Sequence, residues 1–436
     1  MNYIPVNKKE RAEMLESLGY SSLDDLYAGL PEKALLNKEL NLPEGRSEIE
    51  VLRLMKELAK ENTVYDSIFM GGGFYNHYIP ACVKAIVSLP GFLTAYTPYQ
   101  AELSQGILRS IFEYQSAICE LTGMDVSNAS VYDGSTAAAE AVMMITGKKQ
   151  KKVLVSSCVD DFTLEVIRTY AFGRNVEIEV IKEEDGKTSL SDFKGKYDEN
   201  TAGIYLEIPN KYGLIENTEE FVSLTHDNKG KVIMGVDPMT LSLLKTPYES
   251  GADVAVGEGQ GLGLELAYGG PYFGFMAAKK ELTRSLPGRM VGKTVDRYGK
   301  EAYVLTLQAR EQHIRREKAS SSICSNQQLA AMQALVYLNS LGKQGFKKVG
   351  KACLSKAHYL ADELVRAGCK MKYEGEFFNE FAVELPCDYD VFFKALKDKG
   401  ILGGLKLDDK SMLVAVTELN TLEEMNKFVQ TLKEVK

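Results

Sequence analysis

Between residues 150 and 280 the chain alternates short apolar runs with amphipathic segments, and this pattern restricts its fold more than any other feature. The runs are short enough to be buried strands, while helical periodicity fills several of the gaps, as in Phe162–Phe172 and Glu219–Asp227. The predicted strands are Val153–Ser156, Val176–Ile181, Gly203–Ile208, Val232–Asp237, Ala252–Val256 and Tyr272–Ala278. Strands that alternate with helices predict a mostly parallel sheet with helices on both faces.

The segments on either side of this region differ in pattern. Near the N-terminus, Ser47-Glu48-Ile49-Glu50 is a capping box that opens a helix with an apolar stripe. Longer helices are predicted at Ile107–Thr122, Thr136–Thr146, Asn326–Leu341 and Phe346–Ala367, and short strands and helices follow to the C-terminus. We therefore predict an N-terminal helical arm (residues 1–65), a large α/β domain (66–340) and a small α+β domain (341–436).

Charge and composition exclude several classes of protein. Acidic residues outnumber basic ones by 60 to 52, which argues against a nucleic-acid surface, and no apolar stretch is long enough for a membrane span. The N-terminus lacks the apolar segment of a signal peptide, and the seven cysteines are scattered, so we expect a reduced, cytoplasmic protein. The four histidines lie far apart along the sequence, and we expect no metal site.

Two short segments carry groups suited to binding a ligand. Ser135 and Thr136 follow Asp133-Gly134 at a predicted helix start, where free N–H groups and the helix dipole favour a phosphate. An ordinary capped helix explains the same residues. Asp237 ends a strong apolar strand, at the edge of an α/β sheet where ligands bind. A turn-initiating Asp-Pro explains it equally well.

The order of these segments is more informative than either one. A phosphate-type loop, several βα units, a strand-end aspartate and a glycine-rich segment occur in this order in fold-type-I pyridoxal-phosphate enzymes. Those enzymes hold the cofactor through a lysine some two to three dozen residues after the aspartate. Residues 246–278 of this chain contain no lysine; Lys245 comes too early, and Lys279 and Lys280 follow the next strand. The sequence predicts this fold without its Schiff-base lysine.

Several longer motifs resemble the N-terminal half of the glycine cleavage system P-protein family. The matching segments are Thr94–Gln100, Ser104–Gly106, Glu113–Gln115, Glu120–Asp125, Tyr132–Ala137, Gly257–Gln260, Gly269–Tyr272, Arg310–Ala319 and Ile323–Gln327. In its length and in the extent of this likeness, the chain resembles the alpha subunit (subunit 1) of the two-chain form of the family. One departure is Val159-Asp160-Asp161, where such chains usually carry Val-His-Pro.

The resemblance implies a role for the chain. P-proteins decarboxylate glycine with pyridoxal phosphate and pass the aminomethyl group to the lipoyl arm of the H-protein. In the two-chain form the beta subunit carries the cofactor lysine, and the equivalent position here is at or next to Gln260. We therefore expect a vestigial pocket formed by Ser135, Thr136, Asp237 and Gln260, no covalently bound cofactor, and no activity without the beta subunit.

A polar aromatic block is the best candidate for reaching into the partner's active site. It consists of Tyr75, His77, Tyr96, Tyr99 and Gln100. Tyrosine hydroxyls are suited to binding the glycine carboxylate, and His77 to proton transfer, although plain interface packing is the alternative. The resemblance implies an alpha–beta heterodimer that doubles to a heterotetramer.

Two other functions remain open at this point. One is a self-contained pyridoxal-phosphate lyase or aminotransferase that uses Lys279 or Lys293. The other is a scaffold protein of the same fold without chemistry.

Overall fold

The computed structural model describes residues 6–36, 38–147 and 149–435. The chain divides into two compact units, and the boundary along the sequence falls between Thr63 and Val64. The first unit holds the helices α1 (Lys8–Ser17) and α2 (Glu48–Lys60), with the short 3-10 helices η1 (Asp24–Tyr27) and η2 (Glu32–Ala34) between them. The predicted capping box is confirmed, because the Ser47 amide donates to Glu50 at 2.8 Å. Within the described structure α2 has no buried residue, so its apolar stripe is exposed.

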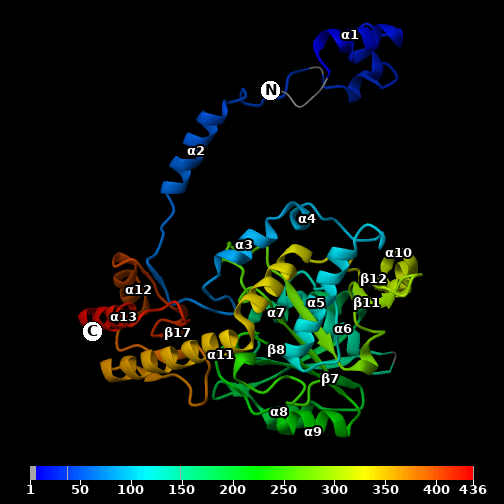
Figure 1. Ribbon diagram of the computed structural model, residues 1–436. Coiled ribbons are helices and arrows are strands. Elements are labelled where there is room, and N and C mark those ends of the chain that lie inside the picture. The colour runs from blue at the N-terminus through cyan, green and yellow to red at the C-terminus, as the bar shows by residue number, and fades with distance from the viewer. Residues whose placement is uncertain (1–5, 37, 148, 436) are drawn as a thin grey trace. The chain divides into compact units, whose positions relative to one another are not determined.

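A seven-stranded sheet forms the centre of the second unit (Figure 1). Its order is β2-β10-β9-β8-β7-β3-β4, and the strands from β9 to β4 are parallel while β10 runs antiparallel to both of its neighbours. The strands are β2 (Val126–Ser127), β3 (Lys152–Ser156), β4 (Glu177–Ile181), β7 (Thr201–Ile208), β8 (Lys231–Val236), β9 (Val254–Glu258) and β10 (Gly274–Ala278). The predicted, mostly parallel sheet is confirmed.

Helices cover both faces of this sheet, because successive residues of a buried strand point to opposite sides and both sides are apolar. One face packs on α6 (Gly134–Ile145) and α7 (Asp161–Arg174) through residues such as Val155 and Ile233. The other packs on α5 (Gln105–Thr122), α8 (Leu190–Lys196), α9 (Glu219–Asp227) and the start of α11 (Gln328–Ala367) through residues such as Leu154 and Met234.

A smaller antiparallel sheet, with the order β13-β14-β17-β16, lies in the C-terminal part of the second unit, which is called the small domain below. Its elements are β13 (Lys370–Met371), β14 (Glu380–Glu384), α12 (Tyr389–Asp398), β15 (Ile401–Leu402), β16 (Leu405–Asp408), β17 (Ser411–Ala415) and α13 (Leu422–Val435). The helix α11 (Gln328–Ala367) leads into it and has a non-helical residue, Gly342, where two helices were predicted. The strand β1 (Ser67–Ile68) pairs with β15, and Phe69 joins this domain's core.

Several shorter elements complete the second unit. They are α3 (Ala81–Val87), α4 (Pro90–Leu93), α10 (Gln312–Arg315), the hairpins β5 (Glu183–Glu184) with β6 (Lys187–Thr188) and β11 (Met290–Val295) with β12 (Glu301–Thr306), and the 3-10 helices η3 (Thr240–Ser242), η4 (Lys280–Leu282), η5 (Gln308–Arg310) and η6 (Arg316–Lys318).

Candidate functional site

The ends of two neighbouring strands bring the predicted pocket residues to one edge of the sheet. β8 and β9 are parallel neighbours, so Asp237, directly after β8, and Gln260, just after β9, lie at the same edge. The N-terminus of α6 joins them there, because the Gly134 amide contacts the last residue of β9. The structure therefore brings together the four residues of the predicted pocket.

Gln260 stands where the resemblance places the Schiff-base lysine, and its side chain is engaged inside the protein. The residue is 1 % exposed. Its Nε2 donates to the carbonyls of Tyr75 at 3.0 Å and Leu264 at 2.8 Å, and its Oε1 accepts from the Tyr75 amide at 2.9 Å. The amide ties the Tyr75 segment to the loop after β9, and it has no nucleophilic nitrogen to offer a carbonyl group.

The carboxylate of Glu258 binds the helix start that would otherwise receive a phosphate. Its Oε2 accepts from the Gly134 amide at 2.9 Å and its Oε1 accepts from the Gln260 amide at 3.0 Å. A Cβ at Gly134 would lie 2.8 Å from the Glu258 nitrogen, so only glycine allows this approach. Burial raises the pKa of Glu258 to about 7.

A second carboxylate completes the first turn of α6. Asp133 is the N-cap residue, and its Oδ1 accepts from the Thr136 amide at 2.7 Å. The Ser135 hydroxyl lies 2.9 Å from the hydroxyl of Thr163, at the start of α7. The ordinary capped helix, which the sequence left open, is therefore present, and the chain's own side chains occupy the groups that suit a phosphate.

Asp237 is the pocket residue that keeps an unused group. Its Oδ1 accepts from the Met239 amide at 3.0 Å, as in the turn that the sequence left open, while its Oδ2 is buried and has no partner among the described residues. Burial raises the pKa of this carboxyl, and the nearby His77 opposes the shift in part. The position suits the ring nitrogen of a pyridine.

Pyridoxal phosphate does not fit this pocket as its side chains stand. The Gln260 amide replaces the amine that holds the cofactor, and the Glu258 side chain already accepts from the Gly134 amide at the α6 N-terminus, where the phosphate would bind. Only Asp237 matches a cofactor group.

Tyr75 is buried in the wall of the pocket, where it meets a carboxylate from the small domain. Its hydroxyl donates to Glu380 Oε2 at 3.0 Å, and the Gly72 amide donates to Glu380 Oε1 at 2.6 Å. Burial raises the pKa of Glu380 to about 7, and burial followed by the Glu380 charge raises the pKa of Tyr75. The pair joins the segment before α3 to β14.

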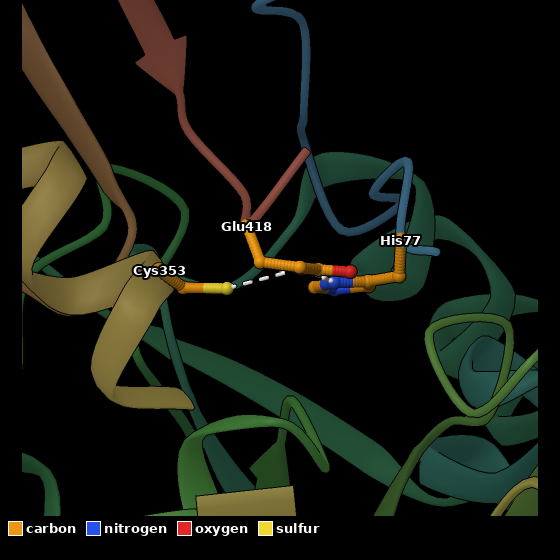
Figure 2. Close-up of side chains that lie close together, drawn as sticks. All are labelled: His77, Cys353 and Glu418. Atoms are coloured by element: carbon orange, nitrogen blue, oxygen red, sulfur yellow. Dashed lines mark hydrogen bonds and ion pairs between the residues drawn. The ribbon is translucent and has the colours of Figure 1, made fainter. Parts of the chain in front are cut away.

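His77 lies beside a second small-domain carboxylate (Figure 2). Its Nδ1 is 2.7 Å from Glu418 Oε2, Cys353 Sγ donates to the same oxygen at 3.4 Å, and the Tyr78 amide donates to Glu418 Oε1 at 2.6 Å. Burial opposes ionisation of Glu418, but the His77 ring and the Tyr78 amide outweigh it, so its pKa lies below the usual value. Burial raises the pKa of the Cys353 thiol.

The other residues of the predicted aromatic block face solvent. Tyr96 is 84 % exposed and Tyr99 is 56 % exposed, and Gln100 is also exposed. Arg289 donates to the Tyr99 hydroxyl at 3.1 Å and its guanidinium lies 5.3 Å from the centre of that ring. The block therefore divides in two: Tyr75 and His77 are buried in this chain, and the other three residues form an outer surface.

The lysines considered as alternative Schiff-base residues lie elsewhere. Lys279 pairs with Asp253 at 3.0 Å. Asp253 precedes β9 and Gln260 follows it, so the length of a strand, roughly 16 Å, separates Lys279 from the pocket. Lys293 pairs with Glu301 across the β11–β12 hairpin.

The segment that departs from the family, Val159–Asp161, provides the N-cap of α7, because Asp160 accepts from the Thr163 amide at 2.8 Å.

Comparison with known families agrees with this architecture. The family described as "Glycine cleavage system P-protein" matches residues 1–432. The chain belongs to this family. The resemblance predicted from the motifs is confirmed, and so is the fold class.

Two P-protein relatives match along their whole length. The chain is 45 % identical over 441 residues to the probable glycine dehydrogenase (decarboxylating) subunit 1 of Carboxydothermus hydrogenoformans, covering 99 % of each chain. A crystal structure of glycine decarboxylase (P-protein) of the glycine cleavage system, in inhibitor-bound form, is similar over 100 % of both chains, with 39 % identity and a TM-score of 0.93. The sphingosine-1-phosphate lyase of Burkholderia pseudomallei, at 13 % identity, 93 % and 94 % coverage and a TM-score of 0.68, shares the fold alone.

Three site residues of this P-protein chain were not predicted. Glu258 lies two residues before the lysine position, and an acidic residue there, beside a phosphate-type helix start, was the available signal. Glu380 and Glu418 come from the small domain, more than a hundred residues later, and no local motif marks them.

None of the described helices is both long and apolar enough to cross a membrane.

Proposed function

We propose that this chain is the cofactor-free subunit of a two-subunit glycine dehydrogenase (decarboxylating), and that it acts only with a lysine-bearing partner subunit. The assembled enzyme decarboxylates glycine with pyridoxal phosphate held by the partner and passes the aminomethyl group to the lipoyl arm of the H-protein. We place the reaction in the cytoplasm, and we propose a heterodimer that doubles to a heterotetramer.

The hydrogen bonding of Gln260 carries this proposal. A simple loss of the lysine at this position would leave its polar surroundings without hydrogen-bond partners. The Gln260 amide instead uses both N–H groups and its oxygen to bind the surrounding backbone. Together with the Glu258 carboxylate at the α6 N-terminus, it makes the pocket a structural element. The relative with 99 % coverage is named a subunit, which supports a separate partner chain.

The exposed segment 96–103 is the part of this chain best suited to complete the partner's active site. Tyr96 and Leu103 are 84 % and 82 % exposed, and aromatic side chains are enriched in the cores of protein interfaces. Arg289 orients the Tyr99 hydroxyl, whose own proton is available for an acceptor such as the glycine carboxylate. We propose that Tyr96, Tyr99 and Gln100 contact the partner, while Tyr75 and His77 hold this chain's interior.

Reconstitution tests this function. Each subunit is purified alone and assayed for release of carbon dioxide from glycine in the presence of lipoylated H-protein. We expect neither subunit to be active separately and the mixture to be active. Full activity of the lysine-bearing subunit without this chain would contradict the proposal.

A further inference from the structure

Three side chains from distant parts of the sequence converge in the second unit, next to the loop after β9 that carries Gln260. His77 comes from the segment before α3, Cys353 from α11, and Glu418 from the loop after β17 (Figure 2). Their ligand atoms all lie within 4.8 Å of one another. Donor atoms around a tetrahedral zinc ion are roughly 3.3–3.7 Å apart, given bonds of about 2.0–2.3 Å. Small side-chain movements would therefore bring all three atoms to one ion.

The donor types favour a particular metal. Imidazole, thiolate and carboxylate are the ligands that zinc accepts, whereas magnesium and calcium bind almost entirely through oxygen. Tetrahedral sites of mixed nitrogen and sulfur ligands are typical of zinc among the common divalent ions. We propose that His77, Cys353 and Glu418 bind a zinc ion that joins the segment before α3, the helix α11 and the small domain.

Buried polar atoms without partners lie on residues in and near the cluster. His77, which is 6 % exposed, leaves Nε2 without a partner among the described residues, and the hydroxyl of the fully buried Tyr337 and Oδ2 of Asp237 are in the same state. Tyr337 interacts electrostatically with Glu418 and Cys353, and Asp237 interacts with His77, so both residues lie near the cluster. Buried polar groups without partners are rare, because leaving one unpaired destabilises the folded state.

The charges and protons balance when zinc binds. The ion replaces the thiol proton of Cys353, which leaves to solvent, and no group is oxidised or reduced. The imidazole stays neutral when its proton moves from Nδ1, the atom beside Glu418, to Nε2, which faces Gly261. Two negative ligands neutralise the ion. The nearby Lys356 ammonium, which donates to the Glu418 carbonyl, opposes its binding.

Metal analysis of the full-length chain tests the site. The purified protein is stripped with EDTA, incubated with a small excess of zinc, desalted and analysed for metal content. We expect about one zinc per chain, a higher thermal unfolding midpoint than the stripped protein, and, with cobalt in place of zinc, a near-ultraviolet thiolate-to-cobalt absorption band. Cys353→Ser should lose the band and most of the bound metal, and Glu418→Gln should weaken binding at least tenfold.

Cys158→Ser is the matched control, because Cys158 is as fully buried as Cys353 and lies outside the cluster. It should keep the metal and the cobalt band even if it lowers stability. Circular dichroism identifies variants that fail to fold, and Glu418→Gln then replaces Cys353→Ser as the test. A wild-type chain that retains no zinc after desalting, or zinc retention that both cluster variants leave unchanged, would overturn the proposal.

Discussion

The pocket at the sheet edge and the exposed segment 96–103 use similar side chains in opposite ways. In the pocket, Gln260 is buried and Glu258 is partly buried, and their polar groups bind backbone atoms of the same chain. In the segment, Tyr96 and Gln100 are exposed. The contrast separates polar groups that bind the chain's own backbone from surface groups that, in our proposal, contact another subunit.

The largest difference in stability is expected between alanine substitutions of the buried Gln260 and the exposed Gln100. Gln260→Ala leaves the Tyr75 amide and two buried carbonyls without partners, at about 1–3 kcal/mol each, so we expect a loss on the order of 4 kcal/mol in the free energy of unfolding. Gln100→Ala, at an exposed position, should change it by less than about 0.5 kcal/mol. Urea unfolding measures both, and equal effects would refute a structural role for Gln260.

The buried carboxyl Glu380 should give stability a characteristic dependence on pH. Because burial raises its folded-state pKa to about 7 from 4.5, the folded chain holds the proton more tightly than the unfolded chain does. This contribution to stability is therefore present below about pH 4.5 and is lost as the pH rises through 7. Glu380→Gln lacks the titration, so between pH 5 and 8 the wild type should lose roughly 2–3 kcal/mol relative to it.

Glu384, on the same strand but exposed, provides the comparison for Glu380. The difference between wild type and Glu384→Gln should stay constant over the same pH range. Parallel curves for Glu380→Gln and Glu384→Gln would mean that the raised pKa of Glu380 is wrong.

A smaller effect is expected from the exposed segment, and it should appear only in the assembled enzyme. Tyr96→Phe should leave the stability of this chain unchanged, because the ring is 84 % exposed. If its hydroxyl binds a charged group in the complex, activity should fall roughly ten- to a hundredfold, equivalent to about 1.5–3 kcal/mol. Tyr248→Phe, at a 47 % exposed tyrosine outside the segment, should keep full activity. Unchanged activity of Tyr96→Phe would assign Tyr96 to packing.

The sheet was predictable because its strands are buried on both faces and therefore form continuous apolar runs. The predicted strand Val232–Asp237 and the observed β8 differ by one residue at each end. The strand predicted at Ala252–Val256 is shifted to Val254–Glu258, because a glycine-rich segment leaves no apolar signal for its end. The antiparallel direction of β10 was also not visible, since an apolar run does not record its direction.

The site was predictable where a residue follows a strand, opens a helix or falls in a motif of the family. Asp237 was found from its position after a strand, and Gln260 was found from the family resemblance. The carboxylate partners of Tyr75 and His77 were not found, because Glu380 and Glu418 reach the pocket region through tertiary packing from a distant part of the sequence. The burial of His77 was hidden for the same reason: a histidine in a glycine- and tyrosine-rich segment carries no local sign of being enclosed.

Borohydride reduction of the assembled enzyme tests the central claim most directly. The complex of both subunits is reduced in the presence of pyridoxal phosphate and digested, and the modified peptides are identified by mass spectrometry. With Gln260 at the lysine position and Glu258 at the α6 N-terminus, we predict one modified lysine per pair of subunits, in the partner, and no stoichiometric adduct in this chain. A stoichiometric adduct on Lys279, Lys293 or another lysine of this chain would contradict the account.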